Sequence, residues 1–181
     1  TRGTIEAIKH TSCLGAIDED LYHVIRAEEE VQIDDLVVKP FKISHDAAEP
    51  VAYTFSSGNS KAGIITDLGV YTDDIISKFS GLDTIFIESN HDINMLMAGP
   101  YPYVLKQRIL GHRGHLSNED CGRLLGQLLN ERTENVFLSH LSKENNFPEL
   151  AYKSVLEQIE NKDLTLNVAS RFEPTKFFEV S

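Results

Sequence analysis

Long apolar runs, cysteines and basic residues are all scarce in this sequence, and each shortage excludes a class of protein. No apolar run approaches the length of about 20 residues that a membrane-spanning helix needs. The two cysteines, Cys13 and Cys121, lie in unrelated contexts and form neither a metal-binding motif nor a disulfide framework. We therefore expect a protein of the reducing cytoplasm that is not bound to a membrane.

The charge balance is acidic, with 17 basic and 28 acidic residues and a net charge of −11. Such a surface does not hold nucleic acid by bulk electrostatic attraction. It does not exclude a nuclease, because bound divalent cations reverse the local sign of charge where a phosphate lies. The 181 residues, of which 41% are hydrophobic and 25% charged, fit one globular domain or most of a larger one.

Predicted strands alternate with predicted helices along the chain, and there are no repeats, low-complexity stretches or linkers. The alternation, together with apparent hairpins, predicts an α/β protein with a mixed sheet. We expect strands at residues 30–33, 36–43, 51–55, 62–66, 84–88, 136–139 and 164–168. We expect helices at residues 4–14, 73–79, 103–110, from 117 onward and 148–160.

Two segments in the middle of the chain have distinct local signals. Residues 98–102, AGPYP, are rich in Gly and Pro and predict a rigid loop. Ser117, followed three residues later by Asp120, matches a helix capping box. The predicted helix then carries an apolar stripe at Leu124, Leu125, Leu128 and Leu129.

Three predicted strands each lead, directly or after one residue, to a polar residue that binds metals well, namely His45, Asp67 and His140. In α/β proteins, ligands gather at the carboxyl ends of strands. Two imidazoles and a carboxylate suit a divalent transition metal. Taken singly, each has a structural explanation, since a strand-end histidine is often hydrogen-bonded and Asp67 precedes a turn. No local motif such as histidines at i and i+4 decides between these interpretations.

Several segments resemble the motifs of metallo-β-lactamase-fold nucleases. Residues 44–53, SHDAAEPVAY, are similar to a motif in which a ligand histidine precedes a strand. Residues 66–69, TDLG, and 138–142, LSHLS, are similar to motifs that supply a metal-bridging aspartate and a further ligand histidine. Other segments narrow the resemblance to the bacterial YycJ/WalJ-type nucleases: residues 88–92 (ESNHD), 99–102 (GPYP), 105–110 (LKQRIL), 114–120 (GHLSNED) and 142–146 (SKENN).

The resemblance implies a metallo-β-lactamase fold, which is a four-layer αββα sandwich. The family's His-x-His-x-Asp-His motif precedes the matched region, and this chain has no such motif. We therefore expect residues 1–181 to be the C-terminal portion of a single domain, a fragment that lacks the N-terminal strands and half of the metal site. Such a fragment alone should be inactive, and its exposed apolar sheet surface favours a homo-oligomer.

The resemblance also implies roles for the strand-end residues. Two divalent metal ions, Zn or Mn, would activate a water, with Asp67 bridging them, His45 completing one site and His140 the other. His115 is similar to a histidine that assists catalysis without binding metal, so His115 and Asp67 are the expected catalytic residues. His115 precedes the capped helix, where free N–H groups favour an anion. The structural alternative is that His115 only packs against the helix entry.

Further residues near these motifs have less specific signals. Glu88 ends a strand and either holds a ligand histidine in place or is simply solvated. Among the nearby basic residues only Arg113, between two glycines and two histidines, is favoured as a phosphate contact. Ser117 and Asn118, at the helix start, are expected to bind substrate. His91 is either a substrate contact or hydrogen-bonded within its loop, and the adjacent Asp92 favours the hydrogen bond.

The function implied by the resemblance is that of a metal-dependent phosphodiester hydrolase, a DNA exonuclease that acts from 5′ to 3′. Two alternatives stay open. The fold also hosts small-molecule metallohydrolases of the thioesterase or lactamase type, although residues 114–117, GHLS, favour the nuclease. A stable half-domain without catalysis, serving as an interaction module, is the other alternative.

Overall fold

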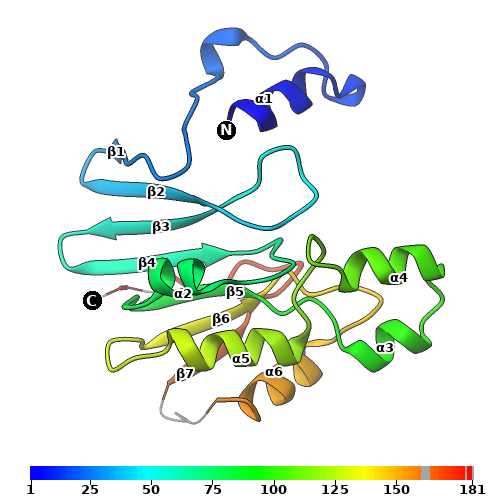
Figure 1. Ribbon diagram of the computed structural model, residues 1–181. Helices are drawn as coiled ribbons and strands as arrows, with labels where there is room; N and C mark the ends of the chain where they lie inside the picture. The colour runs from blue at the N-terminus through cyan, green and yellow to red at the C-terminus, as the bar shows by residue number, and fades with distance from the viewer. Residues whose placement is uncertain (160–163, 178, 181) are drawn as a thin grey trace.

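One seven-stranded mixed sheet runs through the protein in the order β1 to β7 (Figure 1). The computed structural model describes residues 1–159, 164–177 and 179–180. The strands are antiparallel from β1 to β4 and parallel from β4 to β7. Their bounds are β1 (Val31–Ile33), β2 (Leu36–Lys42), β3 (Val51–Ser57), β4 (Ser60–Ile65), β5 (Thr84–Glu88), β6 (Asn135–Ser139) and β7 (Thr165–Val168).

Helices cover one face of the parallel half of the sheet. These are α2 (Asp73–Phe79), α5 (Asn118–Leu128) and α6 (Pro148–Leu156). Leu124 and Leu125 of α5 are fully buried, as are Ile85 and Ile87 of β5, and all four belong to one core cluster. Ser117 caps α5 by accepting a hydrogen bond from the Asp120 N–H, which confirms the predicted helix start at Ser117.

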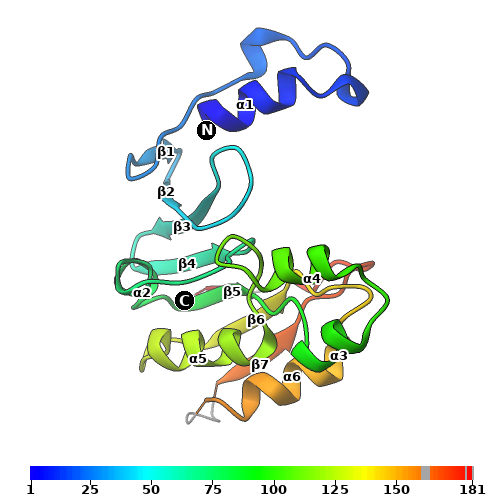
Figure 2. The same cartoon turned by 45° about the vertical axis from the view of Figure 1, so that its right-hand side comes forward.

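The remaining helices lie outside this core (Figure 2). Helices α3 (Ile93–Ala98) and α4 (Tyr103–Leu110) form an arm beyond the carboxyl ends of the parallel strands. Helix α1 (Arg2–Lys9) has no buried residue and lies beyond the β1–β2 end of the sheet. No helix in the described part of the chain is both long enough and apolar enough to cross a bilayer.

The opposite face of the sheet is also apolar. The register places Tyr53, Ile64, Phe86 and Phe137 in one row across β3 to β6. Phe86 and Phe137 stack with ring centroids 4.5 Å apart, whereas Ile64 is 39% exposed. The C-terminal segment returns to the edge of this face, where the Ser60 hydroxyl donates to the Val180 carbonyl. The homo-oligomer expected from exposed apolar surface stays a prediction.

The sequence predicted every strand and missed one helix. Helix α3 was not expected, although Asp92 caps it by accepting from the Met95 N–H. The predicted helix over residues 4–14 is instead α1 followed by a single 3₁₀ turn (Ser12–Leu14), and a second such turn is Glu19–Leu21. Helix α6 ends at Leu156, and the predicted end at Glu160 lies outside the described residues.

Candidate metal centre

The three strand-end residues converge at one edge of the sheet, after β2, β4 and β6. The Nε2 atom of His45 lies 3.5 Å from Oδ1 of Asp67, and the Nε2 atom of His140 lies 3.7 Å from the same oxygen. These separations are too long for good hydrogen bonds. They are the separations expected of atoms that each bind a shared cation at ~2.0–2.2 Å. Strand order alone predicts this meeting point, whereas the role of these residues as metal ligands stays a prediction.

Asp67 and His140 both adopt the left-handed backbone conformation, with φ of 57° and 56°. This conformation is uncommon outside glycine and costs of order 1–3 kcal/mol when the residue is held there. Hydrogen bonds to residues distant in sequence hold both turns. The Leu68 N–H donates to Glu88 Oε2 at 2.8 Å, and the Asn90 amide donates to the His140 carbonyl at 3.0 Å. The chain thus turns sharply after both β4 and β6, and such left-handed turns cluster at functional sites.

Glu88, at the end of β5, lies fully buried behind the site. Its Oε1 atom accepts hydrogen bonds from Nδ1 of His115 and from Nδ1 of His140, each at 2.7 Å. Burial by itself would raise the pKa of Glu88, but the hydrogen bonds from these two rings outweigh it and lower the pKa. Glu88 is therefore an ionised carboxylate, and its hydrogen bonds fix two histidine rings.

The hydrogen bonds of the rings decide which nitrogen faces the site. Nδ1 of His45 lies 3.0 Å from the Gly114 carbonyl, which only accepts, so Nδ1 carries the proton. Nδ1 of His140 donates to Glu88, and this bond raises the pKa of His140. Both Nε2 lone pairs therefore face Asp67. Metal-binding histidines are oriented by a partner on the other ring nitrogen in the same way.

His115 lies between the other two histidines. Its ring centroid is 5.0 Å from that of His45 and 5.4 Å from that of His140. Because Nδ1 is bonded to Glu88, Nε2 is the nitrogen left for a substrate or a cation. Asp67, Glu88, His115 and His140 each offer an atom within 4.8 Å of the others. His45 is not in that group of four but adjoins it through Asp67.

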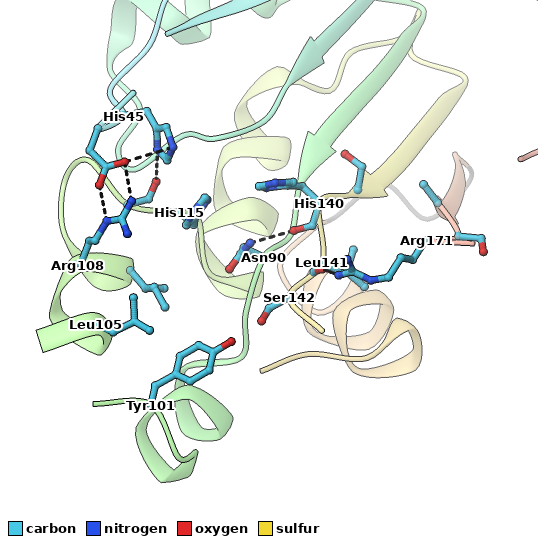
Figure 3. A pocket seen from close by; sticks show the side chains of 16 residues that line it. His45, Asn90, Tyr101, Leu105, Arg108, His115, His140, Leu141, Ser142 and Arg171 are labelled. Atoms are coloured by element: carbon cyan, nitrogen blue, oxygen red, sulfur yellow. Dashed lines mark hydrogen bonds and ion pairs between the residues drawn. The ribbon is translucent and has the colours of Figure 1, made fainter. Parts of the chain in front are cut away.

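A cavity of about 590 Å³ opens in front of these histidines (Figure 3). Its lining includes His45, His115 and His140 on the strand-end side and Tyr101 and Leu105 on the α4 side. Two arginines also line it. Arg108 is held by Asp46 in a two-pronged pair, with Nε to Oδ2 at 2.5 Å and Nη2 to Oδ1 at 3.1 Å, and Arg171 donates to the Leu141 carbonyl.

The residues expected to bind substrate lie around this cavity and not in its lining. Arg113 is exposed and donates from Nε to the His45 carbonyl at 3.1 Å. Ser117 is buried as the cap of α5. Asn118 is fully buried, and its amide group bonds Ser89 and Asn146. Substrate binding by these three residues stays a prediction.

A buried amide network behind His140 was not predicted. The Asn146 amide donates to the carbonyls of Ser89 at 2.9 Å and Asn90 at 3.1 Å. Its oxygen accepts from Asn118, which ties the network to the start of α5. Because Asn90 in turn bonds the His140 carbonyl, the network holds the left-handed turn at His140. The asparagines at the end of the SKENN segment were the available signal, but their partners are distant in sequence.

His91 differs from the loop hydrogen bonder that the sequence favoured. It is 1% exposed, and neither ring nitrogen has a hydrogen-bond partner among the described residues. Burial lowers the pKa of His91 from 6.5 to about 4, so the ring is neutral. The expected hydrogen bond is wrong because the backbone of His91 pairs with Ser117 and leaves the ring enclosed.

Comparisons with known proteins identify sequences that are similar to this chain. No protein-family profile matches the chain. The exodeoxyribonuclease WalJ of Streptococcus pneumoniae (strain D39) is 36% identical over 165 residues, which cover 91% of this chain and 61% of that protein. The chain is a relative of WalJ. The exodeoxyribonuclease YycJ of Bacillus anthracis is 36% identical over 172 residues, or 95% of this chain and 64% of that protein.

The structural comparison identifies the fold. The crystal structure of YhfI from Bacillus subtilis, a metallo-β-lactamase-fold protein, matches with a TM-score of 0.57 at 13% identity. The match covers 80% of this chain and 51% of YhfI. The predicted metallo-β-lactamase fold is confirmed. The chain spans about three fifths of the curated WalJ and YycJ sequences, 61% and 64%, and builds one sheet with helices on one of its faces.

Proposed function

We propose that this chain carries part of the catalytic centre of a metal-dependent exodeoxyribonuclease that cleaves DNA from 5′ to 3′. The observation that carries the proposal is the convergence of two imidazole Nε2 atoms and one carboxylate after the alternate strands β2, β4 and β6. The kinship to proteins named exodeoxyribonuclease supports DNA as the substrate. The 5′-to-3′ direction rests on the family resemblance alone.

The residues present fit a divalent metal ion. His45, Asp67 and His140 offer two nitrogens and an oxygen, a donor set that suits Zn or Mn. A bound divalent cation supplies Lewis-acid stabilisation of phosphoryl charge and activates water. We propose two cations, with Asp67 shared between them. These three residues are too few to complete both coordination shells, so further donors are needed.

His115 is proposed as the proton donor to the leaving oxygen. In its proposed role as the acid, His115 keeps the Nδ1 hydrogen bond to the Glu88 carboxylate. The remaining N–H, on Nε2, is then available to the cavity that His115 lines. A proton delivered by a side chain held in this way typically accelerates a reaction by ~10²–10⁴-fold.

Arg108 and Arg171 are proposed to contact the phosphates that flank the scissile bond. Both line the cavity within a chain of net charge −11. The two hydrogen bonds from Arg108 to Asp46 partly neutralise its charge. They also orient its guanidinium before a substrate arrives. A cluster of bound divalent metal ions and arginine side chains in one cavity would allow an acidic protein to bind an acidic polymer.

The test compares His115→Ala with His140→Ala in the complete gene product that contains this chain. His115→Ala should keep its metal content and lose ~10²–10⁴-fold in kcat on end-labelled duplex DNA. His140→Ala should lose metal together with activity. Labels at the 5′ and 3′ ends report the direction of cleavage. The 181-residue chain by itself is expected to cleave little DNA.

Three outcomes would contradict the proposal. If His115→Ala lost metal as His140→Ala does, His115 would be a ligand and not the proton donor. If it kept the wild-type rate, His115 would only pack against the helix entry. Turnover of a thioester or lactam with no DNA cleavage would replace the nuclease with a small-molecule hydrolase.

A further inference from the structure

The α4 side of the cavity is largely apolar apart from Arg108, in contrast to the histidine side. Tyr101, Leu105 and Ile109 line it. We propose that this wall is a nucleobase-binding subsite in which Tyr101 stacks against the base next to the scissile phosphate. This inference rests on the proposed nuclease function and adds the part of the substrate that the metal centre does not recognise.

The two sides of the cavity match the two halves of a nucleotide. His45, His140 and Arg171, together with Arg108 at the border of the α4 wall, suit an anionic phosphate, whereas Tyr101, Leu105 and Ile109 form an apolar wall. Figure 3 shows the Tyr101 ring projecting into the cavity, opposite the histidines. A ligand that joins a phosphate to an aromatic ring contacts both sides at once.

Tyr101 is available for such a contact. Its side chain is half-buried, so one part of the ring is anchored and another faces the cavity. Its hydroxyl forms no hydrogen bond with the described residues, so no polar contact explains its position. Leu105 and Ile109 lie one helical turn apart on α4 and present aliphatic surface to the same cavity.

A buried lysine holds the backbone that leads into Tyr101. Lys106, which is 9% exposed, donates from Nζ to the carbonyls of Met97 at 2.6 Å and Gly99 at 2.8 Å. It therefore captures the last carbonyls of α3 and joins them to α4. Gly99 also has no room for a side chain, because an added Cβ would lie 2.9 Å from the Met95 carbonyl oxygen.

The loop therefore holds Tyr101 rigidly between Pro100 and Pro102, whose rings restrict the backbone. A ring that is ordered before binding loses little conformational entropy when a base stacks on it. Stacking also tolerates any base, because every base has an aromatic face. These properties suit a nuclease that removes successive nucleotides regardless of sequence.

The test uses oligodeoxynucleotides that differ only at the terminal nucleotide, which carries either a normal base or an abasic tetrahydrofuran. The complete gene product in its metal-loaded form should prefer the base-containing substrate by about 5-fold to 150-fold in kcat/KM, the effect expected of one stacked base. Tyr101→Phe should retain this preference. Tyr101→Leu should abolish it by slowing only the base-containing substrate.

Tyr103→Leu is the matched control. Tyr103 is 69% exposed at the start of α4 and does not line the cavity. Its substitution should leave the preference unchanged. If Tyr101→Leu kept the full preference, or if Tyr101→Phe lost it, the stacking proposal would be wrong while the nuclease function stood.

A binding measurement separates the subsite from the reaction. A 2-aminopurine at the end of an oligonucleotide with a non-hydrolysable terminal methylphosphonate should lose fluorescence on binding, because stacking quenches it. Tyr101→Leu should restore the fluorescence and Tyr103→Leu should not. Quenching without any DNA hydrolysis would support the subsite and reject the nuclease. If the base-containing and abasic substrates were hydrolysed with equal kcat/KM and no quenching occurred, the subsite would be rejected.

Discussion

Replacing Glu88 by glutamine should loosen the metal centre without removing a ligand. Glu88 accepts the Nδ1 hydrogen bonds of His115 and His140 on one oxygen and the Leu68 N–H on the other. A glutamine has one amide oxygen and one NH₂ group. In either orientation of the amide, its NH₂ group faces a group that donates a hydrogen bond to Glu88 in the unaltered protein. Either the Leu68 N–H or the two histidine rings must lose their acceptor.

The size of the effect follows from this mismatch. A buried donor left without an acceptor costs about 1–3 kcal/mol of the free energy of unfolding. If the NH₂ group faces His140, the ring shifts its proton to Nε2, the atom proposed to bind metal. Loss of a partner that orients a metal-binding histidine typically weakens metal binding by ~10–100-fold. We expect an increase of that size in the Kd for Zn or Mn.

The assay is calorimetric titration of metal into the chelator-stripped protein, beside urea unfolding of the metal-free protein. Asp83→Asn is the control, because Asp83 is 4% exposed at the opposite end of β5 and accepts from Arg132 and the Lys61 N–H. It should lower the free energy of unfolding without changing the Kd. The reasoning would be refuted if Glu88→Gln left the Kd unchanged, or if Asp83→Asn raised it equally.

Two further substitutions test the surroundings of the site. The pKa of His91 is lowered from 6.5 to about 4, so between these pH values the unfolded chain binds protons that the folded chain does not. The free energy of unfolding contributed by His91 should therefore fall by about 2 kcal/mol from pH 7.5 to pH 5, and His91→Leu should remove that part of the pH dependence in urea unfolding. An identical pH dependence in both proteins would be the contrary result. Asn146→Ala should lower the free energy of unfolding by about 1–3 kcal/mol and weaken metal binding through Asn90 and His140; wild-type metal affinity in calorimetry would show that the network does not hold the site.

The strand ends were predictable because they depend on local sequence. Asp67 and His140 each follow an apolar strand, and parallel neighbouring strands bring their carboxyl ends to one edge. The spacing of apolar and polar residues therefore places both side chains without knowledge of distant contacts. His45 meets them at the same edge, since β2 runs antiparallel to β3 and β3 antiparallel to β4.

Distant pairings were not predictable from one sequence. Arg108, which lines the cavity, is held by Asp46, 62 residues earlier, whereas the favoured Arg113 turns to the His45 backbone. The burial of Glu88 depends on β4 and β6 on either side of it, so the sequence left its role open. Such features arise from tertiary packing and leave only weak local signals.

The most direct test of the metal centre is an anomalous difference map of crystals grown with zinc, recorded at the zinc absorption edge. The account predicts a peak ~2.0–2.2 Å from Nε2 of His45 or His140 and from an Asp67 carboxylate oxygen. A strong zinc peak elsewhere in the protein, with none beside Asp67, would contradict it.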